Sequence, residues 1–209
     1  MTVNTSKTKL MHCRTASTPK TLVTCVFQNR KLLFVNSYRY IGLNLNEYMN
    51  FSHTASILAA ASSRALGVLT NKYYKMNVIR FETYKKLFDT CALPVLNYGS
   101  EMWGHKHCQK LETVLHRLIK QFLETTKTTP LSMILDDFGE YLLKIHRQLK
   151  IIKYWLHIIS FLDSILLRVV YVVIKRNNRS WCHDVREILT QCDMEEVYLA
   201  DGHPYTDHT

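Results

Sequence analysis

The spacing of hydrophobic residues changes near residue 50. Between Thr21 and Leu45, Val, Phe, Leu and Tyr are frequent; a polar stretch at residues 28–31 interrupts them, and they resume as LLFVNSYRYIGLNL. Short apolar runs separated by a polar turn predict a β-hairpin with a following strand. After Asn50 the apolar residues recur at helical spacing. The sequence therefore predicts a mainly α fold with a small N-terminal β-hairpin.

Four helices are predicted in the middle of the chain. Residues 54–73 are rich in Ala and Leu, and residues 78–96 form a second helix that Pro94 bends or ends. A third, amphipathic helix is predicted because apolar residues recur at i, i+4, i+7 and i+11, namely Leu111, Leu115, Leu118 and Phe122. A short fourth helix starts at Thr129-Pro130, because Pro is favoured in a first turn.

The segment PVLNYGSEMWG, residues 94–104, ends an apolar helical run with a Tyr-Gly turn. Gly99 can adopt the positive φ that terminates a helix, and Ser100 with Glu101 can start the next element.

The run from Tyr141 to Ile174 contains the most extended apolar stretch. Its second half, WLHIISFLDSILLRVVYVVI, has the length of a membrane span, but His157, Asp163 and Arg168 interrupt it. Each charged residue at a bilayer centre costs about 2.5–3.5 kcal/mol on insertion scales, so a buried helix is favoured over a membrane partner. The first half places a polar face on one side of a helix, formed by His146, Lys150, Lys153 and His157.

The net charge of +10 is unevenly distributed. Residues 1–40 contain no acidic residue, residues 141–180 contain Asp163 as their only acid, and the tail from Trp181 onward is acidic. Two basic blocks indicate a polyanionic partner such as nucleic acid or an anionic membrane surface, although a merely solvated basic surface is the alternative interpretation.

The cysteines and histidines do not form a recognisable metal motif. The six cysteines have no dense disulfide pattern, and the polar start MTVNTSKTK has no secretory h-region, so an intracellular, nuclear or cytoplasmic protein without a signal peptide is expected. Two groups could suggest zinc, but neither has the usual ligand spacing; they are His105 with His107 and Cys108, and Cys182 with His183. No metal site is predicted.

Several segments, taken in order, resemble the part of LINE-type, non-LTR retrotransposon reverse transcriptases that follows the catalytic strands. These segments are NTSKTK, SYRYIGLNL, RALGVL, PVLNYGSEMWG, KLETVLHRLIKQFL, LKIIKYWL and SWCHDVREILTQCDMEEVY. Each is short, and their order and spacing over nearly the whole chain carry the resemblance.

The resemblance implies roles for two groups of residues. The family's Asn-x-x-Lys-Thr element near the incoming nucleotide falls on Asn4, Lys7 and Thr8. The primer-grip hairpin falls on Tyr40, Ile41 and Gly42, with Ile where the family has Leu. The helices that follow correspond to a thumb that holds template and primer.

The resemblance also implies that catalytic carboxylates are missing. Polymerases of this type join nucleotides with two Mg²⁺ ions held by palm carboxylates upstream of the Asn-x-x-Lys element, so no cofactor is expected for this chain alone. Leu135-Asp136-Asp137-Phe138 imitates a catalytic turn but lies too late in the chain, and we predict that it ends a helix before Gly139. No catalytic residue is assigned.

We therefore expect three regions: a palm and primer-grip remnant (1–50), a helical thumb-like bundle (51–140) and a post-thumb helical region with an acidic tail (141–209). The expected function is that of a partial reverse transcriptase (RNA-directed DNA polymerase) that lacks the catalytic palm carboxylates. On its own it is expected to be inactive as a polymerase and to retain at most binding of an RNA template with a DNA primer. The alternatives are a non-catalytic part of a complete polymerase, joined to its palm and fingers, and a host-derived interaction protein that uses the apolar helix at 154–174. The nucleic-acid-binding residues predicted are Lys7, Lys9, Arg30, Lys31, Arg39, His146, Lys150, Lys153 and His157.

Overall fold

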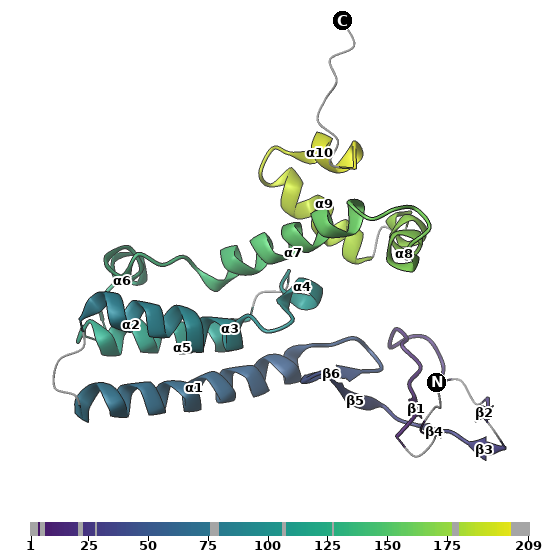
Figure 1. Ribbon diagram of the computed structural model, residues 1–209, viewed down its shortest axis with the longest axis horizontal. Helices are drawn as coiled ribbons and strands as arrows, with labels where there is room; N and C mark the ends of the chain where they lie inside the picture. Colours follow the sequence, from purple (N-terminus) through teal and green to yellow (C-terminus); the bar gives the residue numbers. More distant parts are fainter. Residues whose placement is uncertain are drawn as a thin grey trace, which may run out of the picture.

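The computed structural model describes residues 4, 7–20, 23–27, 29–75, 80–105, 108–126, 128–176 and 180–201. Over these residues the protein is mainly helical, with short strands confined to the N-terminal part (Figure 1). The strands are β1 (Lys9–Leu10), β2 (Val26–Phe27), β3 (Arg30–Lys31), β4 (Leu33–Phe34), β5 (Ser37–Tyr40) and β6 (Leu43–Asn46).

The helices occupy most of the described chain after residue 51. They are α1 (Ser52–Lys75), α2 (Phe81–Leu87), the π-helical turn η1 (Phe88–Ala92), α3 (Leu93–Leu96), α4 (Ser100–Trp103), α5 (Gln109–Phe122), α6 (Leu131–Phe138), α7 (Leu143–Ile159), α8 (Leu166–Lys175), α9 (Trp181–Thr190) and α10 (Glu195–Leu199). The predicted fold class is confirmed.

The strands pair into three separate two-stranded sheets. Strands β2 and β3 form one antiparallel hairpin, β5 and β6 form a second, and β1 pairs in parallel with β4. The segment predicted as a single strand after the first hairpin is thus itself a hairpin. Its two turn residues, Ile41 and Gly42, have φ of 45° and 82°, and positive φ at both positions is the geometry of a type I′ turn, whose twist matches that of paired strands.

Pro94 does not end the second predicted helix at its own position. The helix passes through η1 and continues as α3 to Leu96, with Pro94 in the first turn of α3. Because Pro lacks an N–H and its ring displaces a preceding carbonyl, a wider π-helical turn just before it accommodates the ring without breaking the helix. The predicted start of this helix at residues 78 and 79 lies outside the described residues.

Two hydrophobic cores share helix α7. The first joins α1, α2, η1, α3, α4, α5 and α6, and contains all three Leu residues of the predicted α5 stripe, Leu111, Leu115 and Leu118, with Phe122 packed at its edge. The second joins the C-terminal half of α7 to α8, α9 and α10, around Trp155 and Tyr171. Figure 1 shows α7 running above the first group of helices toward the second.

The prediction of one buried helix over the second half of the 141–174 run is wrong. Helix α7 ends at Ile159, and α8 begins only at Leu166. Asp163 lies between them, with a side chain 94% exposed and paired with Arg168 at 3.4 Å. The break keeps this carboxylate in water, whereas a continuous buried helix would desolvate it. Within the described chain, no helix is both long and apolar enough to cross a membrane.

Candidate nucleic-acid interface

The segment PVLNYGSEMWG forms the helix end and turn that its sequence predicts. Gly99 has a φ of 61°, and α4 starts at the next residue, Ser100. A Cβ atom on Gly99 would lie 2.6 Å from Cδ1 of Leu43, so a larger residue here would also displace the Leu43 side chain of β6. The side chain of Trp103 is fully buried beneath the turn, and its indole N–H donates to the carbonyl of Tyr98 at 3.3 Å.

This turn holds the β5–β6 hairpin against the helical core. The hydroxyl of Tyr98 donates to the carbonyl of Ile41 at 2.6 Å. Leu43, on the strand after the turn, is buried. The side chains of Tyr40 and Ile41 are instead 57% and 70% exposed. The hairpin is therefore anchored on one side and presents its Tyr-Ile turn to solvent on the other.

The same turn also contacts the C-terminal helices. The ammonium group of Lys150 on α7 donates to the carbonyl of Asn97 at 3.0 Å and lies 3.5 Å from a carboxylate oxygen of Glu101. The indole N–H of Trp181, at the start of α9, donates to the carbonyl of Glu101 at 2.8 Å. One short turn thus connects the hairpin, α7 and α9.

Arg147 is the most buried charged side chain at this junction. It is 1% exposed, its Nε donates to Oδ1 of Asn97 at 3.2 Å, and its guanidinium lies 5.2 Å from the ring centroid of Trp103. Burial lowers the pKa of Arg147, and the carboxylate of Glu112 opposes that effect. Because Arg147 shares a helix face with Leu143 and Ile151, helical spacing alone could have located it on the buried side.

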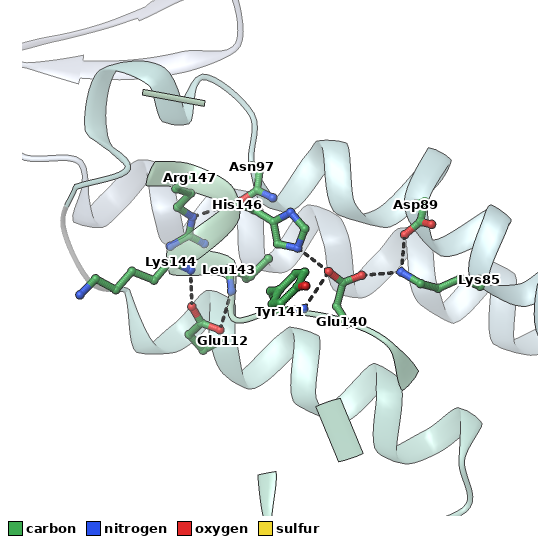
Figure 2. Close-up of polar contacts among 10 residues, drawn as sticks. All are labelled: Lys85, Asp89, Asn97, Glu112, Glu140, Tyr141, Leu143, Lys144, His146 and Arg147. Atoms are coloured by element: carbon green, nitrogen blue, oxygen red, sulfur yellow. Dashed lines mark hydrogen bonds and ion pairs between the residues drawn. The ribbon is translucent and has the colours of Figure 1, made fainter. Parts of the chain in front are cut away.

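The N-terminus of α7 is capped by a side chain from another helix. Glu112 on α5 is buried, and its two carboxylate oxygens accept the backbone N–H groups of Leu143 at 3.3 Å and Lys144 at 3.2 Å (Figure 2). A carboxylate at a helix N-terminus satisfies donors that have no intrahelical partner and complements the helix dipole. Sequence reasoning missed Glu112 because its partners lie more than thirty residues away along the chain.

A second buried carboxylate, Glu140, joins α2 to α7. It accepts hydrogen bonds from the ammonium of Lys85 at 2.6 Å and the N–H of Tyr141 at 3.1 Å, and it also pairs with the ring of His146 (Figure 2). Burial by itself would raise the pKa of Glu140, but the hydrogen bonds from His146, Lys85 and Tyr141 lower it to about 2. Glu140 is therefore ionised at neutral pH and holds the start of α7 against α2.

The polar face predicted on α7 borders a cleft. His146, Lys150 and Lys153 line a space of about 270 Å³ together with Leu93, Pro94, Asn97, Leu149 and Asp89. Lys153 and His157 are exposed, whereas His146 and Lys150 are half-buried. His146 pairs with Glu140, and Lys150 contacts Glu101 and the carbonyl of Asn97. The structure thus brings three of the four residues to one cleft, and leaves Lys153 as the cation best placed to meet a ligand.

The basic residues predicted in the first block lie on separate elements. Lys9 is on β1, Arg30 and Lys31 are on β3, and Arg39 is on β5. All of these except the half-buried Lys9 are exposed, and Lys7 is exposed as well. Lys7 and Thr8 follow Asn4 in a local turn, in which the hydroxyl of Thr8 donates to the carbonyl of Asn4 at 2.8 Å.

Leu135-Asp136-Asp137-Phe138 forms the end of α6, as predicted. Asp136 and Asp137 are exposed, Phe138 is buried, and Gly139 follows with a φ of 62°. Within the described residues, no group of three or more His, Cys, Asp or Glu side chains is arranged to hold a metal ion. His107, one of the histidines considered for zinc, lies outside those residues.

Comparison with protein-family models, with curated proteins and with solved structures finds no match to this chain.

Proposed function

We propose that this chain is the primer-grip, thumb and post-thumb part of a non-LTR retrotransposon reverse transcriptase, and that it binds the sugar-phosphate backbone of nucleic acid. The observation that supports this most is the contact between the β5–β6 hairpin and the turn at Gly99. Two segments that carry the resemblance, SYRYIGLNL and PVLNYGSEMWG, meet through Tyr98 and Ile41, although these residues are 57 positions apart.

The arrangement of this contact suits backbone binding. The hairpin is anchored through Leu43 and exposed at Tyr40 and Ile41, so its turn is accessible to a ligand while the hairpin is held against the helices. The thumb-like helices add the α7 cleft with Lys153. Cations and aromatic residues of this kind contact phosphates and sugars rather than base edges, so binding is expected to have little sequence preference.

Salt dependence provides the test. If about five phosphates are neutralised, log K should fall with log[salt] with a slope of roughly −4 on a duplex. Fluorescence anisotropy with a labelled RNA–DNA hybrid at several salt concentrations measures this slope. Lys153→Glu should weaken binding to all sequences alike and make the slope less steep by about one.

Lys153 is a better choice for this test than Lys150, because Lys150 holds the turn at Asn97. Lys86→Glu is the matched control, since Lys86 is an exposed lysine on α2. An affinity that is independent of salt, or that falls equally in the two variants, would mean that the α7 cations form only a solvated surface.

A second candidate function is protein interaction through α8. Leu166 and Val173 are 76% and 66% exposed on this helix, and clustered exposed apolar side chains favour contact with another surface. Analytical ultracentrifugation of the chain and of a Leu166→Ser, Val173→Ser variant tests it. Equal sedimentation at high concentration, with no self-association in either protein, would argue against a self-associating role for this face.

A further inference from the structure

Helix α8 exposes apolar side chains and turns its two charged side chains toward the protein. It packs against α7 and α9 at one side of the C-terminal helices (Figure 1). The side chains of Arg168 and Lys175 are only 13% and 27% exposed, because both pair with Asp201. Leu166 and Val173 are instead 76% and 66% exposed. Surface helices of monomers usually have charged residues on the solvent side, so this inversion favours contact between the outer face of α8 and another surface.

The exposed apolar residues of α8 form one continuous stripe. They lie at i, i+3, i+4 and i+7, a spacing that places them on one side of a helix; they are Leu166, Val169, Val170 and Val173. Val169 and Val170, in the middle of the stripe, are 44% and 43% exposed. A contiguous exposed apolar patch on a soluble domain marks an interaction site rather than ordinary surface.

The two ends of this stripe carry opposite charges. Asp163 lies in the turn before α8 with a side chain 94% exposed, so its pair with Arg168 at 3.4 Å leaves the carboxylate open to solvent. Arg176 follows the last residue of α8 and is also exposed. The stripe is therefore acidic at its N-terminal end and basic at its C-terminal end.

This pattern is complementary to itself when the helix direction is reversed. Asp163 and Arg176 are equally far along the chain from the midpoint between Val169 and Val170, and so are Leu166 and Val173. A two-fold axis at this midpoint would bring Asp163 of each copy to Arg176 of the other, because residues i and j of a symmetric interface meet twice. A parallel pair would place like charges together instead.

An anionic lipid surface fits the same face less well. Helices that lie on such membranes carry cations beside the apolar stripe, where they reach the headgroups. Asp201 holds Arg168 and Lys175 on the opposite side of α8, and Asp163 adds a negative charge at the edge of the stripe. A second copy of the chain supplies Arg176 to that charge, whereas an anionic membrane would repel it.

We propose that the outer face of α8 pairs with the same face of a second copy of this chain, with the two helices antiparallel. The apolar stripe supplies the contact area, and the charged ends set the direction of the helices. The proposal rests on the second candidate function above, protein interaction through α8, and names its partner. It is independent of the nucleic-acid binding proposed for the hairpin and α7.

Analytical ultracentrifugation of the full chain at low salt, without nucleic acid and over a range of concentrations, tests the pairing. The wild type should form a dimer as its concentration rises. Asp163→Lys and Arg176→Glu should each raise the dimer Kd by about tenfold, because each change replaces two opposite-charge contacts with two like-charge contacts. Arg117→Glu is the matched control, since Arg117 is an exposed arginine on α5 in the first core, and it should leave the Kd unchanged.

An equal mixture of the Asp163→Lys and Arg176→Glu chains gives the sharpest test. Both end contacts between unlike chains are then favourable, so the mixture should recover the Kd of the wild type, and this recovery also shows that both variants are folded. A dimer that is lost in Leu166→Ser, Val173→Ser but is unaffected by either charge reversal would leave the α8 contact standing and overturn the antiparallel pairing.

A wild-type chain that stays monomeric at every concentration would exclude a second copy on α8 and overturn the proposal. In that case, flotation of the chain with vesicles that contain phosphatidylserine, lost in Leu166→Ser, Val173→Ser, would assign the outer face of α8 to a lipid surface.

Discussion

Replacing Glu140 with Gln should destabilise the protein in a pH-dependent way. The carboxylate is nearly inaccessible to solvent, with a side chain 3% exposed, and it holds Lys85 and His146. Gln has almost the same shape and keeps one acceptor oxygen, so the change removes the charge and leaves the packing. Lys85 retains a second carboxylate partner, Asp89 at 2.9 Å, which limits the disturbance on α2.

The size of the effect follows from the pKa of Glu140. A value of about 2 in the folded protein, against an ordinary value of 4.5, corresponds to about 3 kcal/mol of stability at pH 7. Because the folded pKa is the lower one, this stability is present above pH 4.5 and is lost as the pH falls toward 2. By pH 3, about 2 kcal/mol of it should be gone.

Urea unfolding followed by circular dichroism at pH 7 and pH 3 measures both quantities. Glu140→Gln should be less stable than the wild type by about 3 kcal/mol at pH 7, and the difference should shrink to about 1 kcal/mol at pH 3. Asp137→Asn is the control, because Asp137 is an exposed carboxylate on the adjoining helix and its change should stay within about 0.5 kcal/mol. A difference between Glu140→Gln and wild type that is the same at both pH values would refute the reasoning.

Three further changes test the turn and the second core. Tyr98→Phe removes the hydrogen bond to Ile41, so it should lower stability by about 0.5–1.5 kcal/mol and speed amide exchange in the hairpin, measured by hydrogen exchange. Gly99→Ala places a Cβ against Leu43 at positive φ, so a thermal melt should show a loss of at least about 1–2 kcal/mol; an unchanged melt would contradict the close packing. Burial by itself would raise the pKa of Asp201, but the hydrogen bonds from Lys175 and Tyr171 lower it below its ordinary value. Asp201→Asn should therefore be less stable than the wild type at neutral pH, and the two proteins should converge in urea stability as the pH falls below 4 and the carboxylate is protonated.

Local sequence accounts for much of the helical architecture. The apolar stripe of α5, the turn at Gly99 and the end of α6 at Gly139 were all predictable, because helical spacing and the conformational freedom of glycine act within a few residues. The break between α7 and α8 was harder to predict. Apolar content alone favoured a continuous buried helix, and it was the solvation of Asp163 that decided otherwise.

Only the tertiary structure determined which polar groups meet. Glu112 caps a helix that begins 31 residues later, and Tyr98 binds a carbonyl 57 residues earlier. Neither partner can be found from periodicity, because a hydrogen bond depends on the positions of two atoms after the chain has packed. The basic residues of α7 differ in their partners for the same reason. Helical spacing placed them on one face, but packing of α7 against the rest of the protein pairs Lys150 and His146 with carboxylates and leaves Lys153 exposed.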